Sequence, residues 1–171
     1  GDWFRACCLL ETFLNSVDNN LYQKHYCDII ERLMRYLARY SGSYMGVCSQ
    51  PSSITRLVGE IVNKMHPNCI YNPFAGLSSY AFISDSDYYG QEINVDTYLL
   101  AQIRLDAYDK NIKSLRRENS IDNWCDLFAD CLVSTPPFGL KLNGVYQREN
   151  SQLYRSIEEF ILSKFLYSSM K

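Results

Sequence analysis

The chain has 171 residues, of which 47% are hydrophobic and 21% are charged. This length and composition indicate an ordered domain with its own core. The formal net charge of −2 provides no overall attraction for nucleic acid, so contact with DNA would require a local basic surface or a partner. The seven cysteines are odd in number and none are spaced as Cys-x-x-Cys. They therefore argue against a disulfide framework or a zinc site, and we expect buried, reduced thiols.

No signal peptide and no apolar run long enough to cross a bilayer is recognisable in the sequence,. We therefore expect a soluble, cytoplasmic protein that does not enter a membrane. The aspartates at positions 122, 126 and 130 form no constellation that indicates a metal site.

Three helices are expected before the first strand. Apolar spacing predicts them over Trp3–Ser16, over Leu21–Tyr40, and from Ser52 or Ser53 to Met65, with one of these two serines as the N-cap,. The third helix should turn five apolar residues toward the core: Ile54, Leu57, Val58, Ile61 and Val62.

The stretch Cys69–Ser79 is the centre of the sequence. It predicts a short strand, a turn through Asn72-Pro73-Phe74-Ala75-Gly76, and a short helix that opens at Ser78 or Ser79. A strand, a glycine-containing turn and a helix start can bind the polar part of a nucleotide-like ligand, because backbone N–H groups point toward it.

The elements that follow alternate between strand and helix. We expect strands at Tyr88–Gln91, Ile112–Arg116 (an edge strand) and Leu127–Val133, and helices at Val95–Tyr108, capped by Asn94, and Tyr154–Ser169,. Glu92 falls at the carboxyl end of its strand, where open α/β sheets place ligand contacts. The helix Val95–Tyr108 should turn Tyr98, Leu99, Ile103 and Leu105 toward the sheet, and Lys141–Gln152 should be a loop.

This alternation predicts an α/β fold, with a Rossmann-like, doubly wound parallel sheet. A helical segment over residues 1–45 should precede a core over residues 46–171. Only four strands are visible, and the last helix should lead into a fifth, so we expect an incomplete domain that is truncated on its C-terminal side.

Five segments together carry a resemblance to a known family. They are Gly46–Ile54, Asn72–Ser78, Gly90-Gln91-Glu92-Ile93-Asn94, Glu118-Asn119-Ser120-Ile121 and Thr135-Pro136-Pro137-Phe138-Gly139. In order and spacing they resemble the N6-adenine DNA methyltransferases, and most closely the modification subunit of type I restriction systems. The family patterns are a loop ending in Thr-Pro, Asp-Pro-(Phe/Ala)-(Ala/Cys)-Gly-Ser-Gly, Gly-Gln-Glu-Ile-Asn, Gly-Asp-Ser/Thr-Leu and Asn-Pro-Pro-Phe-Gly.

The resemblance implies an S-adenosylmethionine-dependent methyltransferase core. The turn at Asn72–Gly76 would hold the methionine end of S-adenosylmethionine with backbone amides, Glu92 would accept hydrogen bonds from the ribose hydroxyls, and Ile93 would pack near the adenine or target base. The implied cofactor-binding residues are Gln50, Pro51, Asn72, Pro73, Phe74, Ala75, Gly76, Glu92, Ile93, Asn119 and Ser120.

The implied catalytic residues are Thr135, Pro136, Pro137 and Phe138. Phe138 would offer a stacking face to a flipped base. In the family, the first residue of this motif and the carbonyl of the following proline hydrogen-bond the adenine amine. They thereby expose its lone pair to the sulfonium methyl group.

The chain departs from the family pattern in and around these motifs. Asn72 replaces Asp, Leu77-Ser78 replaces Ser-Gly, Gln50 replaces Thr and Thr135 replaces Asn. A hydroxyl lacks the reach and planar geometry of an amide, and loss of one oriented contact in an active site typically costs ~100-fold in rate. The departures therefore keep a weak or inactive enzyme among the alternatives.

Three functions follow from the resemblance. The first is an adenine-N6 DNA methyltransferase of a restriction–modification system, with DNA and also specificity and restriction subunits as partners. The second is a degenerate, non-catalytic relative that binds DNA or a partner. The third is a methyltransferase that acts on a protein glutamine or an RNA base.

Overall fold

The computed structural model describes residues 8, 12, 16, 25–36, 50–125, 129–137, 139–142 and 154–169. Residues 25–36 are helical, in agreement with the second expected helix. Residues 8, 12 and 16 of the first expected helix are also helical. The rest of that helix, both ends of the second, most of the loop Lys141–Gln152 and Phe138 lie outside the described residues.

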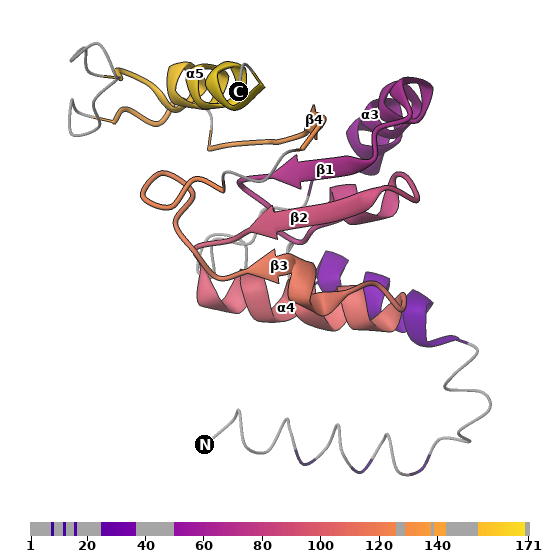
Figure 1. Cartoon of the computed structure of the whole chain (residues 1–171). Coiled ribbons are helices and arrows are strands. Elements are labelled where there is room, and N and C mark those ends of the chain that lie inside the picture. The colour runs from indigo at the N-terminus through magenta and orange to yellow at the C-terminus, as the bar shows by residue number, and fades with distance from the viewer. Residues whose placement is uncertain are drawn as a thin grey trace.

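A four-stranded parallel sheet lies at the centre of the fold, in the order β3-β2-β1-β4 (Figure 1). The strands are β1 (Cys69–Asn72), β2 (Asp87–Gln91), β3 (Leu115–Arg116) and β4 (Cys131–Leu132). In the register, Ile70 lies opposite both Tyr88 of β2 and Cys131 of β4. Because all four strands run in the same direction, their carboxyl ends meet at one edge of the sheet.

Helices cover both faces of this sheet, which confirms the doubly wound α/β fold. On one face, Val62 of α3 (Ser52–Met65) packs with Ile70 and Cys131, and α4 (Val95–Ala107) packs Ala101 and Leu105 against Leu115. On the other face, Phe160 of α5 (Ile157–Ser169) packs in a cluster with Leu132. Neighbouring residues of a strand point to opposite faces, so Cys131 and Leu132 serve different helices.

Several predicted boundaries require correction. The N-cap of α3 is Pro51 rather than Ser52 or Ser53, and its carbonyl accepts the N–H groups of Ile54 at 3.0 Å and Thr55 at 3.2 Å. The short helix after the turn is a 3₁₀ helix, η1 (Ser79–Phe82). Only the last two residues of Ile112–Arg116 are strand, because the first three form the 3₁₀ helix η2 (Ile112–Ser114).

The last helix begins at Ile157 rather than Tyr154. Ser156, just before it, forms an antiparallel bridge with Lys141, which lies at the start of the expected loop. The prediction of a sheet-facing α4 is correct for Leu105 and for the partly buried Tyr98, but wrong for Leu99 and Ile103, which are exposed.

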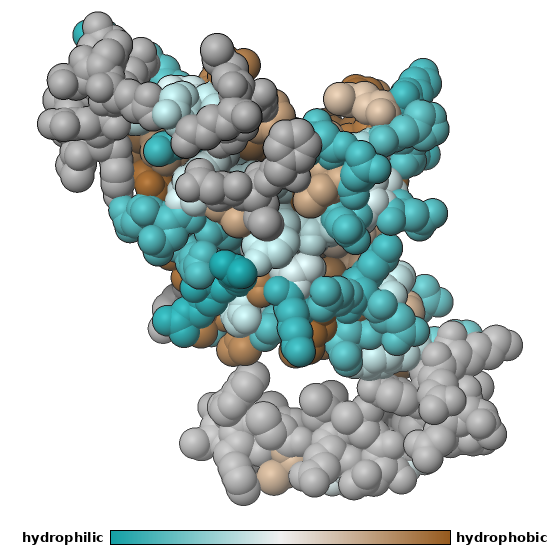
Figure 2. Space-filling model, in the orientation of Figure 1, coloured by the Kyte–Doolittle hydropathy of each residue, from teal (hydrophilic) through white to brown (hydrophobic). Residues whose placement is uncertain are grey.

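The inward face predicted for α3 is also wrong in part. Val62 and the partly buried Val58 join the core, but Ile54, Leu57 and Ile61 are exposed. They lie on the side of the helix that points away from the sheet. Figure 2 shows hydrophobic patches at the surface over both α3 and α4. Helical spacing alone does not decide which side of an apolar helix meets the sheet.

The described cysteines are free, but only Cys131 is buried, so the expectation of buried thiols holds for one of them. Within the described ranges, none of the helices combines the length and the apolar character that a bilayer crossing requires.

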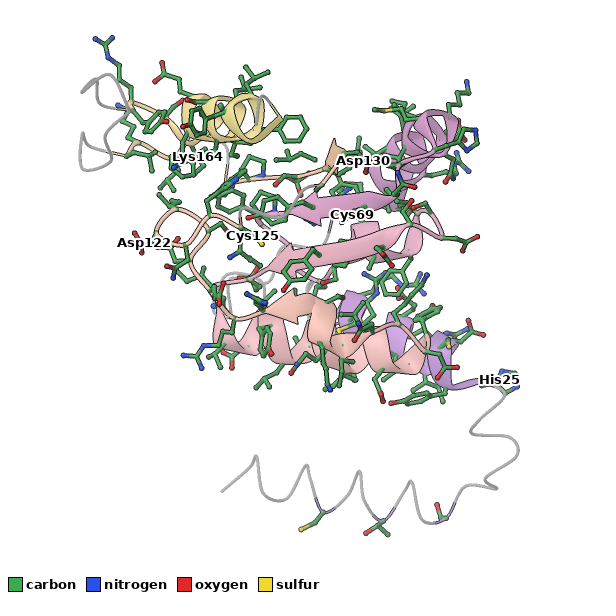
Figure 3. The ribbon with its side chains drawn as sticks, in the orientation of Figure 1. His25, Cys69, Asp122, Cys125, Asp130 and Lys164 are labelled. Atoms are coloured by element: carbon green, nitrogen blue, oxygen red, sulfur yellow. The ribbon has the colours of Figure 1, made fainter. Side chains whose placement is uncertain are left out.

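Asp130 ties the start of β4 to the start of β1. Its Oδ2 accepts the N–H of Asn68 at 2.9 Å, and its Oδ1 accepts the N–H of Cys69 at 2.9 Å. Figure 3 places Asp130 close to Cys69 at this end of the sheet. The Asn68 amide, followed by that of Cys69, holds the pKa of the Asp130 carboxyl below its ordinary value of 3.8.

This contact predicts a pH-dependent contribution to stability. A lowered folded-state pKa means that the contribution is complete above the unfolded pKa and is lost as the pH falls through the folded one. We expect Asp130→Asn to melt at a lower temperature than the wild type at pH 7. The difference should shrink below about pH 4. Thermal melts followed by circular dichroism between pH 7 and pH 2.5 measure it.

The matched control is Asp106→Asn, which changes an exposed carboxylate on α4. Equal pH profiles for wild type and Asp130→Asn would contradict the assignment of this carboxylate to the β1–β4 junction.

Candidate functional site

Side chains of β1 and β2 hold the turn after β1. The Oδ1 atom of the buried Asn72 accepts the N–H of Phe74 at 3.3 Å, and its Nδ2 donates to the Tyr88 hydroxyl at 3.3 Å. Burial raises the pKa of Tyr88 to about 12. Its hydroxyl therefore stays protonated at neutral pH and supports the turn through its contact with Asn72. The Ala75 N–H donates to the Gln91 carbonyl at 2.8 Å, which joins the turn to the end of β2.

Glu92 bridges this turn to the next helix. Its Oε2 accepts the N–H of Gly76 at 2.9 Å, and its Oε1 accepts the N–H of Asn94 at 2.7 Å. Asn94 in turn caps α4, because its Oδ1 accepts the N–H of Thr97 at 2.9 Å. This confirms the predicted cap. A half-buried carboxylate that already accepts two amides can still accept hydroxyl donors, since it offers about four lone-pair sites.

The turn has open space in front of Gly76. Gly76 has a φ of +54°, and a Cβ placed on it would meet no atom within 4 Å. The left-handed backbone conformation favours glycine at this position, and the missing side chain leaves open space beside the Gly76 amide and the Glu92 carboxylate. Ile93, which follows, exposes 64% of its surface. These features suit a ligand that passes close to Gly76, with hydroxyls at Glu92 and a planar apolar group at Ile93.

A buried polar network fixes the loop after β3 behind the turn. The Gln91 side chain donates through Nε2 to Glu118 Oε2 at 2.9 Å and to the Asn123 carbonyl at 2.8 Å. Its Oε1 accepts the Tyr71 hydroxyl. Ser120 is 3% exposed, and its hydroxyl donates to the Pro73 carbonyl. Ser120 therefore supports the turn from behind, while Asn119 bonds within its own loop to Ile121 and Asp122.

On the other side of β1, three side chains form a hydrogen-bonded chain at the end of β4. Thr135 Oγ1 donates to Gln50 Oε1 at 3.2 Å, and Gln50 Nε2 donates to the Tyr80 hydroxyl at 2.8 Å. Thr135 is exposed, Pro136 is buried and Pro137 is exposed. Burial raises the pKa of Tyr80, so its hydroxyl also remains protonated.

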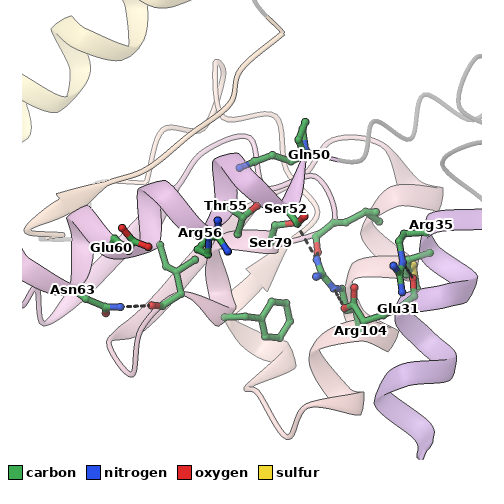
Figure 4. A pocket seen from close by; sticks show the side chains of 16 residues that line it. Glu31, Arg35, Gln50, Ser52, Thr55, Arg56, Glu60, Asn63, Ser79 and Arg104 are labelled. Atoms are coloured by element: carbon green, nitrogen blue, oxygen red, sulfur yellow. Dashed lines mark hydrogen bonds and ion pairs between the residues drawn. The ribbon is translucent and has the colours of Figure 1, made fainter.

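A cavity of about 600 Å³ opens beside Gln50 and Pro51. It lies between α3, η1, α4 and residues 31–35, and its described lining includes neither Gly76 nor Glu92 (Figure 4). Arg104 lies at one side of it, where its Nε contacts Glu31 Oε1 at 2.6 Å and its Nη1 donates to the Leu77 carbonyl at 2.9 Å. Arg104 thereby attaches residues 25–36 to the turn.

The predicted site residues thus form two groups at the carboxyl edge of the sheet. Gly76 and Glu92 meet on the β2 side, and Gln50 and Thr135 meet on the β4 side. Gln50 was expected near a cofactor, but its side chain bonds to Thr135 and Tyr80. Four further residues that support the edge were not among the predicted site residues: Tyr71, Tyr80, Gln91 and Arg104.

Comparison with known proteins gives two findings. The sequence pattern of the family described as N-6 DNA methylase matches residues 22–160. A solved structure, the methyltransferase subunit of a type I restriction–modification system from Streptococcus thermophilus, aligns with 55% of this chain at 21% identity and a TM-score of 0.47. The aligned part is 24% of that subunit, so the chain spans about a quarter of its length.

Gly90, at the end of β2, provides a test of how tightly this edge packs. A Cβ at Gly90 would lie 2.8 Å from the Tyr88 hydroxyl, 3.0 Å from Leu115 Cδ1 and 3.1 Å from Ala75 Cβ. We expect Gly90→Ala to lower the free energy of unfolding by about 1–3 kcal/mol through overpacking. Urea denaturation measures this change.

Gly76→Ala is the comparison, because it meets open space and should cost about 1–2 kcal/mol through its backbone conformation alone. Tyr88→Phe removes the nearest clashing atom, so Gly90→Ala should be less destabilising in that background. Strictly additive effects would contradict the packing explanation.

Proposed function

Because the chain belongs to the N-6 DNA methylase family, we propose that it forms the S-adenosylmethionine-binding core of a DNA methyltransferase that modifies the exocyclic amine of adenine. The observation that carries the proposal is the pairing of Glu92 and Gly76 at 2.9 Å, next to the strand end that bears Thr135 and Pro136. In this proposal, one edge of the sheet offers a hydroxyl acceptor beside the open space at Gly76 on one side of β1, and an amine acceptor on the other.

The cofactor half consists of the turn Asn72–Gly76 with Glu92 and Ile93. S-adenosylmethionine, when bound, supplies an electrophilic methyl group on a sulfonium ion. Glu92 would accept the ribose hydroxyls, and Ile93 would cover the adenine ring. The amino-acid end would lie in the open space beside Gly76, whose own N–H is donated to Glu92. Ser120 and Asn119 would support the cofactor indirectly. The Ser120 side chain bonds to Pro73 of the turn, and the Asn119 side chain bonds within its own loop.

The base half consists of Thr135, Pro136, Pro137 and Phe138. An adenine amine is a weak nucleophile because its lone pair is delocalised into the ring. Hydrogen bonds from the amine to the Thr135 hydroxyl and the Pro136 carbonyl would turn the lone pair out of the ring plane, and stacking on Phe138 would hold the flipped base. Thr135 is exposed at the strand end and Pro136 is buried against the fold, which suits an outward acceptor on a rigid support.

The net charge of −2 makes a partner part of this proposal. Duplex DNA is attracted by clustered positive charge, which this chain does not supply overall. A specificity subunit would therefore hold the DNA and recognise its sequence, and a restriction subunit would complete the system. Such a complex would work in the cytoplasm, where DNA and S-adenosylmethionine are available.

A second candidate is a non-catalytic relative, and Asn72 favours it. Its buried amide bonds to the Phe74 N–H and to the Tyr88 hydroxyl of β2. As an amide, it offers no carboxylate to a positively charged ligand. Such a protein would bind S-adenosylmethionine weakly and would serve through contacts with DNA or a partner.

Calorimetric titration with S-adenosylmethionine distinguishes the two candidates. We expect micromolar binding by the wild type. We also expect Glu92→Ala to weaken binding about 10- to 100-fold, because hydrogen bonds to a charged carboxylate contribute about 1.5–3 kcal/mol. Circular dichroism of the variant checks that its fold is intact.

Asp106→Ala, which removes an exposed carboxylate from the far end of α4, should bind as the wild type does. A folded wild-type chain that gives no heat with S-adenosylmethionine would favour the non-catalytic candidate instead.

A further inference from the structure

Gln50 connects two parts of the chain that lie 85 positions apart in sequence. It stands immediately before the N-cap of α3, and its contact with Thr135 places the start of α3 at the same sheet edge as the end of β4. There the Thr135 hydroxyl donates to Gln50 Oε1 at 3.2 Å. Figure 4 shows Gln50 at the start of α3, beside the cavity.

The direction of this hydrogen bond determines what Thr135 can offer to a ligand. A threonine hydroxyl has one proton and two lone pairs, and it can therefore act as either donor or acceptor. When its proton is donated to Gln50 Oε1, the hydroxyl oxygen presents lone pairs to any group that approaches the exposed side of Thr135. Thr135 is then an acceptor, which suits an amine and not a carbonyl.

Tyr80 is the second hydrogen-bond partner of the Gln50 side chain. Its hydroxyl accepts Gln50 Nε2 at 2.8 Å, and a carboxamide whose nitrogen faces Tyr80 must turn its oxygen toward Thr135. Tyr80 itself is 3% exposed and packs with Val62 and Ile70 in the core. Gln50 is therefore held between Thr135 and a side chain that is anchored in the hydrophobic core.

We propose that Gln50 is a positioning residue that fixes the Thr135 hydroxyl as the acceptor for the exocyclic amine of the target base. This inference rests on the proposed function and specifies how its base half selects a substrate. A base with an exocyclic amine satisfies Thr135, whereas a base that lacks the amine leaves the oxygen without a donor. The Gln50 amide thus accepts the Thr135 proton, and the Thr135 hydroxyl oxygen accepts the amine.

The test compares two fluorescein-labelled trinucleotides, both with saturating S-adenosylhomocysteine and without it. One has adenine as its central base, and the other has purine, which lacks the amine. Fluorescence anisotropy measures the two dissociation constants. For the wild type we expect about fivefold to tenfold tighter binding of the adenine form, the effect of one net hydrogen bond. Thr135→Val and Gln50→Met should bring the ratio of the two dissociation constants, purine form over adenine form, close to one.

Gln50→Glu should restore the preference. A carboxylate also accepts the Thr135 proton, and its second oxygen can accept the protonated Tyr80 hydroxyl. The added charge weakens both complexes alike, so the ratio of the two dissociation constants remains a valid measure. If Gln50 had only a structural role, this ratio would not be lost in Gln50→Met and regained in Gln50→Glu. Ser52→Ala, at an exposed neighbouring position, is the matched control and should keep the wild-type ratio.

Equal or undetectable binding of the two trinucleotides by the wild type would overturn the inference, and so would an unchanged ratio in Gln50→Met. Failure of the proposed function has a different signature, because it would appear as absent binding of S-adenosylhomocysteine by the folded chain. The preference for the amine in the titrations without S-adenosylhomocysteine would still report on Gln50 and Thr135.

Discussion

The carboxylate of Glu92 is the contact on which the organisation of the sheet edge depends. One oxygen accepts the amide of Gly76 in the turn after β1, and the other accepts the amide of Asn94 at the start of α4. Buried or half-buried amides need acceptors, and here a single side chain satisfies two of them from different elements. Glu92 therefore fixes the turn, the end of β2 and the cap of α4 relative to one another. These elements border the open space at Gly76.

Contacts at a distance from this point keep the edge in register. Asp130 fixes the amino ends of β1 and β4, Arg104 attaches residues 25–36 to the turn, and Ser120 supports Pro73 from behind. Parallel strands cannot be joined by tight hairpins, so their relative placement relies on such side-chain ties and on the two helical layers. The β2 side of the edge and the β4 side then flank the same turn, which suits a cofactor and a base that must meet.

The sequence predicted the elements whose signals are local. The turn after Cys69, the strand ending before Glu92 and the Asn94 cap each depend on a few adjacent residues, and the structure contains them. The inward face of α3 was wrong in part because Ile54, Leu57 and Ile61 have helical spacing whichever side meets the sheet. The cap at Pro51 and the 3₁₀ segment before β3 depend on how the chain enters the next element. The packing of the neighbouring helices and strands decides the path of the chain at these points.

By itself, the sequence determined the doubly wound α/β fold, the family resemblance through its motifs, and the candidate residues Gly76, Glu92, Thr135 and Pro136. It also showed Gln50 and Thr135 as two separate departures from the family pattern. Only the tertiary structure placed these two side chains in contact and connected them to Tyr80. Spacing along a chain reports on local geometry, whereas a hydrogen bond across 85 positions exists only after helices and strands have packed.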